Sequence, residues 1–181
     1  MPLPPPTAER TRMHVRSVQL EGYKRNDGCW DIEARLRDVK GHDYPLSSGL
    51  RKQGEAVHDM WVRVTIDAQM NILDAAACVD AMPYVGYCDR IAPDYTKLIG
   101  LNLFHGFRAA VKTLFRSTRG CSHVSELVTF LPTAALQTFA SDVHDNDDNG
   151  HKPYQLDRCH ALESHSDAVQ RYYPRWYRGQ K

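Results

Sequence analysis

Hydrophobic and polar positions alternate most clearly over residues 30–37. Trp30, Ile32, Ala34 and Leu36 fall on one face of an extended segment, and charged residues occupy every position between and after them. A repeat of two places successive side chains on opposite faces of a strand. The segment therefore predicts a half-buried antiparallel strand, with one face packed and one face solvated.

The same period recurs on both sides of this segment. Residues 13–23, 57–67 and 72–79 are expected strands, separated by a turn at 26–28, a polar loop over 41–54 and a hairpin connection at 67–71. In the segment 57–67 the apolar face is Met60, Val62, Val64 and Ile66, and the period of two puts His58 on that face. Residues 13–80 therefore predict an antiparallel meander of three or four strands.

After Pro83 the apolar spacing becomes helical. We expect helices over residues 95–100 with Asp94 as the N-cap, within 104–115, and over 121–131, where Pro132 breaks the pattern before a further helix over 134–143. An acidic loop follows at 142–150. Strands come first and helices after, so the predicted class is α+β, with the helices packed on the sheet.

The chain has 181 residues, which suits one domain. The Pro-rich residues 1–12 are expected to be disordered, and residues 13–181 to form one domain. Its segment 151–181 ends in an aromatic run at 172–177 that anchors the C-terminus. The same run also suits the wall of a substrate pocket or a contact between subunits, so a homo-oligomer is a possible assembly.

Charge and composition exclude several classes of protein. Lys plus Arg is 23 and Asp plus Glu is 22, a balance that argues against a nucleic-acid partner. Mean hydropathy is −0.53 and no long apolar run occurs, so no membrane partner is expected. Five widely spaced cysteines and no signal-peptide pattern favour reduced thiols in the cytoplasm. Without a phosphate-loop motif, no nucleotide cofactor is expected.

The strongest candidate chemistry lies where a helix is expected to begin, at Cys121-Ser-His123. Free backbone N–H groups at a helix start lower the pKa of a thiol, so Cys121 is the expected thiolate. His123 is a second ligand or a general base, and Glu126 orients it or binds metal too. The alternative is that Cys121 is a small buried residue and that Ser122 caps the helix.

Other histidines and cysteines supply further candidates. His58 begins a strand and is followed by Asp59, which points to the other face. The pair is either functional or a core histidine beside a solvated carboxylate. Cys88 lies in a loop that can fold over the end of the sheet. Cys159 and His160 lie near the C-terminus, and one of them can reach a site.

Several of these segments together resemble the bacterial family DUF2889, whose members have no known function. The resemblance runs over residues 13–177 and rests on the segments 22–36, 58–61, 120–123, 159–162 and 172–177. It implies that the family's signature segments include His58, Asp59, Cys121, His123, Glu126, Cys159 and His160. A weaker similarity of pattern is to the NifU-type iron–sulfur scaffold fold, with ligands expected near His58, Cys88 and Cys121.

Three hypotheses follow. The first is a small metal-dependent enzyme, a lyase or hydrolase, which holds one Zn or Fe ion through His58, Cys121 and His123. Cys88, Asp59 or Glu126 completes its site, and a small carbonyl or aromatic-acid molecule is its substrate. Glu126 or Asp59 acts as general base. The second hypothesis is metal-free catalysis by Cys121. The third is a non-catalytic scaffold for a metal, an iron–sulfur cluster or a partner protein.

Overall fold

The computed structural model describes residues 3–140, 150, 152–153 and 155–179. By its internal contacts the chain divides into two compact units, Met1–Thr138 and Phe139–Lys181, and each is described by itself. Within the described residues, none of the helices has the length and apolar character needed to cross a bilayer. The expectation that residues 13–181 form one domain, with 151–181 as an anchor, stays a prediction.

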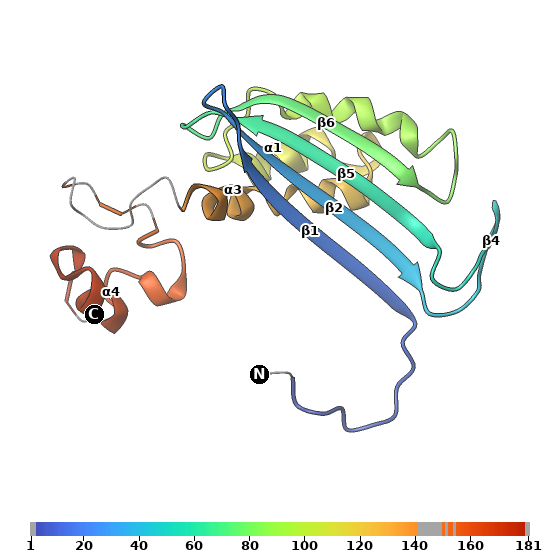
Figure 1. The fold of residues 1–181 in the computed structure, drawn as a ribbon, viewed down its shortest axis with the longest axis horizontal. Helices are drawn as coiled ribbons and strands as arrows, with labels where there is room; N and C mark the ends of the chain where they lie inside the picture. Colours follow the sequence, from blue (N-terminus) through green and yellow to red (C-terminus); the bar gives the residue numbers. More distant parts are fainter. Residues whose placement is uncertain (1–2, 141–149, 151, 154, 180–181) are drawn as a thin grey trace. The chain divides into compact units, whose positions relative to one another are not determined.

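The first unit is built on a four-stranded antiparallel sheet (Figure 1). The strands lie in the order β1-β2-β5-β6. Their bounds are β1 His14–Lys24, β2 Trp30–Lys40, β5 Ala56–Ile66 and β6 Ile72–Ala81. Because each of these strands pairs with the next one along the chain, the predicted meander and the α+β class are confirmed.

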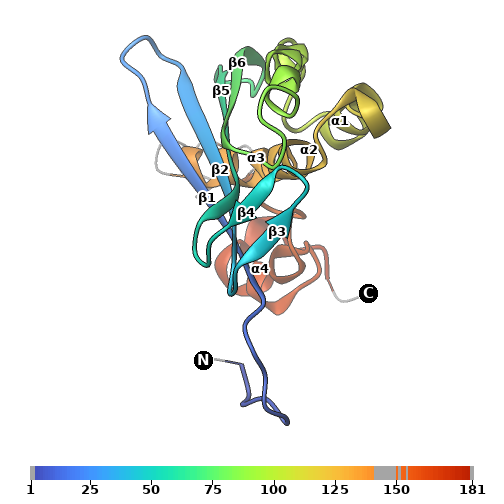
Figure 2. The same cartoon turned by 90° about the vertical axis from the view of Figure 1, so that its right-hand side faces the viewer.

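One face of the sheet is apolar and forms the core. Leu36 of β2 lies opposite Met60 of β5, and Ala34 lies opposite Val62. All four side chains are at most 2% exposed. Figure 2 shows the helices of residues 89–128 on one side of the strands. The charged residues that alternate with the core positions of β2 lie on the opposite face of the sheet.

The helices follow the sheet along the chain and cover its apolar face. Their bounds are η1 (a 3-10 helix) Asp89–Leu98, α1 Phe107–Leu114, η2 (3-10) Ser117–Arg119, α2 Ser122–Val128 and α3 Leu131–Phe139. Helix α2 contacts both β2 and β5. Its residues Val124, Leu127 and Val128 are fully buried, so the short helix is fixed against the centre of the sheet.

Three sequence predictions differ from the structure. The loop expected over residues 41–54 contains a two-stranded hairpin, β3 Tyr44–Leu46 with β4 Gly49–Arg51, which is too short for a periodic signal. Helix η1 begins after Cys88, well before Asp94, and Pro93 lies inside it. The helix expected over 121–131 ends at Val128, so the expected break precedes Pro132, which is the second residue of α3, where its missing N–H costs nothing.

The second unit is small and irregular. It contains the 3-10 helix η3 His160–Leu162, helix α4 Asp167–Tyr172 and the 3-10 helix η4 Pro174–Trp176. Asp157 accepts hydrogen bonds from the backbone N–H and the hydroxyl of Ser164, both at 2.7 Å. The end of the helix expected over 134–143 and the acidic loop at 142–149 lie outside the described residues.

Asp67 organises the turn between β5 and β6. Its Oδ1 accepts hydrogen bonds from the backbone N–H groups of Gln69 and Asn71, and its Oδ2 accepts one from the Asn71 amide. Burial raises the pKa of Asp67, but these hydrogen bonds outweigh it and lower the pKa below its ordinary value.

We expect Asp67→Ala to lower the free energy of unfolding by about 1 kcal/mol at neutral pH, because backbone donors lose their acceptor. The native pKa of Asp67 is depressed, so its contribution is complete above the unfolded value near 4 and is lost as pH falls through the native value. Urea titrations of wild type and variant between neutral pH and about pH 2.5 should therefore show the difference shrinking. A difference that does not change with pH would contradict this role.

Candidate functional site

Polar side chains interrupt the apolar face at one end of the sheet. Strand register brings them together, because Arg16 of β1 lies opposite Asp38 of β2, and Asp38 lies opposite His58 of β5. The period of two that buries Leu36 also turns Asp38 toward the helices. His14, two residues before Arg16, falls on the same face. Four polar residues from three strands therefore meet beneath the helical layer.

Asp38 is the centre of this group and is 3% exposed. Its Oδ1 accepts a hydrogen bond from Nε of Arg16 at 2.8 Å and lies 2.9 Å from Nε2 of His14. Its Oδ2 accepts from Nη2 of Arg16 at 2.9 Å and lies 3.0 Å from Nδ1 of His58. Burial raises the pKa of Asp38, but the hydrogen bonds from Arg16 and His14 outweigh it and hold the pKa well below its usual range. The buried carboxylate is therefore charged at neutral pH.

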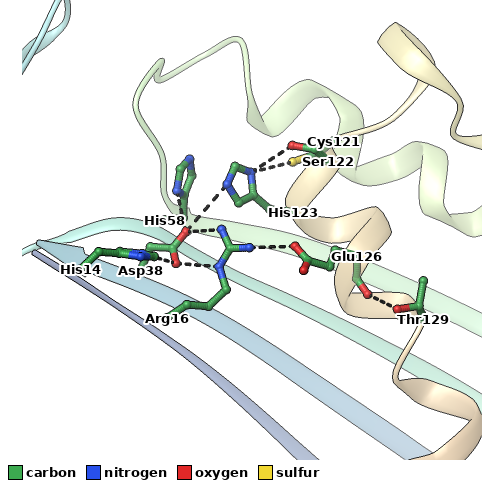
Figure 3. Close-up of polar contacts among 9 residues, drawn as sticks. All are labelled: His14, Arg16, Asp38, His58, Cys121, Ser122, His123, Glu126 and Thr129. Atoms are coloured by element: carbon green, nitrogen blue, oxygen red, sulfur yellow. Dashed lines mark hydrogen bonds and ion pairs between the residues drawn. The ribbon is translucent and has the colours of Figure 1, made fainter. Parts of the chain in front are cut away.

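Helix α2 brings His123 over the same carboxylate (Figure 3). Its Nε2 lies 3.8 Å from Oδ2 of Asp38. The rings of His58 and His123 lie against each other, with centroids 3.9 Å apart and an interplanar angle of 31°. Asp38, His58 and His123 each offer one ligand atom, and these atoms lie within 4.8 Å of one another. The group is a candidate metal site.

The two imidazoles are too close for both to carry a proton without strong repulsion. Burial lowers the pKa of His58, and the charge of His123 lowers it further, against the raising effect of Asp38. His58 is therefore neutral at pH 7. A neutral imidazole is the form that binds a metal ion.

Cys121 faces the other nitrogen of His123. Its Sγ lies 3.9 Å from Nδ1, whereas Nε2 is the nitrogen that faces Asp38. The thiol is thus placed to hold the orientation and tautomer of the imidazole. Burial raises the pKa of the Cys121 thiol, but the hydrogen bond with His123 and the backbone N–H groups of Val124 and His123 outweigh it and lower the pKa below its ordinary value.

Tyr95 of η1 forms hydrogen bonds with the backbone of Cys121. The hydroxyl accepts a hydrogen bond from the backbone N–H of Cys121 at 3.1 Å and lies 3.0 Å from the carbonyl oxygen of the same residue. It also lies 2.9 Å from Oγ of Ser125 in α2. Tyr95 is fully buried, and its ring stacks on Phe115. The phenol therefore fixes the chain where α2 begins.

Of the two carboxylates expected at the site, Glu126 lies at its margin and Asp59 lies on the other face of the sheet. Glu126 accepts a hydrogen bond from Nη1 of Arg16 at 2.7 Å, and its side chain is 54% exposed, so it ties α2 to β1. Asp59 lies on the opposite face of the sheet, where Arg35 binds both of its oxygens at 2.8 and 2.6 Å. The structure therefore does not bring Asp59 to His58, because neighbouring strand residues point to opposite faces.

Two cavities adjoin the histidine pair. One has a volume of about 500 Å³ and is lined by His58, His123, Cys121 and Cys88 together with loop residues that follow β6. The other has a volume of about 330 Å³ and is lined by His58 and His123 together with the polar residues of β1 and β2. The imidazole pair thus lies between two cavities, and Cys88 lines only the larger one.

Cys159 and His160 lie in the second unit. Cys159 is exposed and precedes η3, which begins at His160. The group of potential ligands in the described residues contains neither of them. Their expected part in a site stays a prediction.

His14, Arg16 and Asp38 are not among the site residues predicted from the sequence. A signal for Asp38 was available, because it continues the buried alternation Trp30, Ile32, Ala34 and Leu36 with an acidic residue. A carboxylate at a core-facing strand position needs partners. Its partners could not be named, since they depend on the register of three strands.

Comparison with known proteins places the first unit in a family. The family model "Protein of unknown function (DUF2889)" matches residues 14–137, which include His58, Cys88, Cys121 and His123 but not Cys159. The curated proteins contain no match. The solved structures contain none either, so the NifU-type similarity gains no support. The match covers more than half of the chain and ends one residue before the first unit does, and the chain belongs to the DUF2889 family.

Proposed function

We propose that this protein is a metal-dependent enzyme, with one Zn or Fe ion held by Asp38, His58 and His123. The observation that carries the proposal is that the three ligand atoms lie within 4.8 Å of one another. Around an ion with bonds of roughly 2 Å, neighbouring ligand atoms lie roughly 3–4 Å apart. Oδ2 of Asp38 lies 3.0 Å from Nδ1 of His58 and 3.8 Å from Nε2 of His123, and both separations match this spacing.

The donor set suits the chemistry. Two imidazoles and one carboxylate are a ligand set for Zn or for non-haem Fe(II), and both leave coordination positions for water or substrate. The surrounding residues support the ligands, since Arg16 and His14 hold the Asp38 carboxylate and Cys121 faces the far nitrogen of His123. Cys121, expected as a ligand, is thus a supporting residue in this proposal.

Two carboxylates lie near the proposed ion, because Asp38 and Glu126 share Arg16. A divalent ion bound at Asp38 would act as a Lewis acid and polarise the carbonyl group of a small substrate. A hydrolase or a lyase is the reaction class that we propose.

Metal analysis tests the proposal. Protein purified without oxygen should contain about one Zn or Fe per chain by elemental analysis, and metal-free protein should bind Co²⁺ with visible absorption bands. His58→Ala and His123→Ala should each abolish this binding, because each removes one of only three ligands. The matched control is His105→Ala, an exposed histidine outside the group, which should bind normally. Full metal content in both ligand variants would overturn the proposal, and iron with sulfide would favour the scaffold alternative.

A second candidate function is nucleophilic catalysis by Cys121. The imidazole of His123 lies between a thiol and a carboxylate, which favours this candidate. Sγ of Cys121 lies 3.9 Å from Nδ1 of His123, and Nε2 of that ring lies 3.8 Å from Oδ2 of Asp38. A thiol, an imidazole and a carboxylate in sequence can activate a nucleophile. This candidate and the metal site use the same imidazole.

Iodoacetamide labelling at pH 7 tests the thiol. We expect Cys121 to react at least about tenfold faster than Cys78. Cys78 is exposed, but partial desolvation of its thiol and the nearby charge of Asp80 raise its pKa. His123→Ala should remove the difference. Equal labelling of the two cysteines would count against this candidate. Cys121→Ser separates the two functions, because it should abolish thiol catalysis and still leave about one metal ion per chain, since the ligand atoms remain.

We also propose a cytoplasmic location. The five cysteines, at positions 29, 78, 88, 121 and 159, are all free, which supports a reducing compartment.

A further inference from the structure

The larger cavity lies between the loop after β6, the first residues of η1 and the start of α2. Its volume of about 500 Å³ falls within the range of small-molecule sites. Because His58, His123 and Cys121 line it, a molecule bound there contacts the candidate metal ligands directly. The chemistry of the remaining walls indicates which kind of molecule fits.

Aromatic and apolar side chains form much of the lining. Tyr84 is 49% exposed and Tyr87 is 73% exposed. Both line the cavity, and no described residue covers either ring fully. Met60 and Ile91 add apolar surface. Two tyrosine rings beside apolar side chains favour a flat ring, which can stack on them.

One strong cation lies in the same wall. The guanidinium of Arg90 lies over the ring of Tyr87, 4.9 Å from its centroid. Among the described residues Arg90 forms no ion pair, and no carboxylate lines this cavity. A guanidinium over an aromatic ring keeps its N–H groups at the edge of the contact, where they can bind a carboxylate through two parallel hydrogen bonds.

The smaller cavity does not offer the same site. Its lining includes the Asp38 carboxylate, which already binds Arg16 and would repel a second anion. The difference between the two cavities is therefore a guanidinium without an ion pair among the described residues in one and a guanidinium paired with a buried carboxylate in the other.

We propose that the larger cavity binds a small aromatic carboxylate. Its ring packs against Tyr84 and Tyr87, its carboxylate pairs with Arg90, and its other substituents face His58 and His123. This inference deepens the proposed function, on which its catalytic meaning rests. Binding itself uses residues outside the metal group, so it does not depend on a metal ion.

Calorimetric titration of metal-free protein tests the inference with three probes. Benzoate should bind at millimolar or lower concentration, whereas benzamide (the ring without charge) and cyclohexanecarboxylate (the charge without the aromatic ring) should each bind roughly tenfold more weakly or worse. Arg90→Gln should lower the affinity for benzoate to that of wild-type protein for benzamide. Tyr87→Leu should weaken benzoate more than cyclohexanecarboxylate, because only the aromatic probe loses stacking.

Arg63→Gln is the matched control, because Arg63 lies on β5 outside this cavity and should leave all three affinities unchanged. Absent benzoate binding, or equal benzoate affinity in wild type and Arg90→Gln, would overturn the inference. The metal proposal is judged separately by metal content. Benzoate binding to protein that takes up no metal would therefore support this site and reject the metal centre.

Discussion

Asp38→Ala should abolish metal uptake and also destabilise the fold by about 3 kcal/mol. The substitution removes one proposed ligand and leaves Arg16, His14 and His58 without their shared acceptor. Removing one partner of a buried ion pair is costly because the other charge stays in a poorly solvated position. We expect the lower end of the usual range of destabilisation for a broken buried ion pair, since the Arg16 side chain is 30% exposed and regains some water.

Two measurements follow for this variant. Urea unfolding gives the stability change, and Co²⁺ titration gives the metal affinity. Asp38→Asn refines the result, because an amide keeps the size of the side chain and loses the charge. It should therefore destabilise less than alanine but still abolish metal uptake. Normal Co²⁺ binding in either variant would remove Asp38 from the ligand set.

Asp59→Ala is the matched control on the other face of the sheet. Asp59 is also buried, at 7% exposure, and also binds an arginine through both oxygens. Its loss should destabilise the sheet to a comparable degree and leave metal binding intact. If both variants lose the metal equally, the effect of Asp38→Ala reflects a damaged sheet and not a lost ligand.

Leu127→Ala should lower the free energy of unfolding by about 3 kcal/mol. Leu127 is fully buried in α2, which packs on β2 and β5. Truncation loses the burial of the side chain and leaves a cavity that the sheet cannot fill. The same helix carries His123, so we expect Co²⁺ affinity to fall by about tenfold, as when a supporting residue of a metal site is changed.

Leu73→Ala provides the comparison for this variant. Leu73 is 49% exposed on β6, so its truncation should cost less than about 1 kcal/mol. Urea unfolding followed by circular dichroism measures both variants. A Leu127→Ala protein as stable as Leu73→Ala would show that α2 is not anchored through its buried residues.

The sheet was predictable from sequence because a repeat of two is a local property. The alternation of Trp30 to Leu36 placed a strand, and the same period correctly put His58 on the core face. The hairpin of β3 and β4 was not predictable in this way, since three-residue strands carry no period. The helix boundaries predicted from the sequence differ from those of the structure because proline was taken to break a helix. Pro93 lies inside the 3-10 helix η1, and Pro132 lies in the first turn of α3.

The candidate site was only half predictable. Cys121 and His123 are close in sequence, so their meeting needs only a helix start. The meeting of His123 with His58 and Asp38 depends on how α2 crosses the sheet and on the register of β2 with β5. Long-range geometry of this kind leaves no mark in a single sequence except an acidic residue at a core-facing position.

The position of Arg16 has a consequence for how the site is reached. Strand β1 lies at the edge of the sheet, where among the described strands it pairs with β2 alone, and His14 and Arg16 belong to its first three residues. Strand ends at sheet edges open locally at a small fraction of the cost of global unfolding. Fraying of this end releases Asp38 from its guanidinium while His58, in an inner strand, stays in place. Amide hydrogen exchange over residues 14–16 thus reports how often Asp38 loses its two partners on β1.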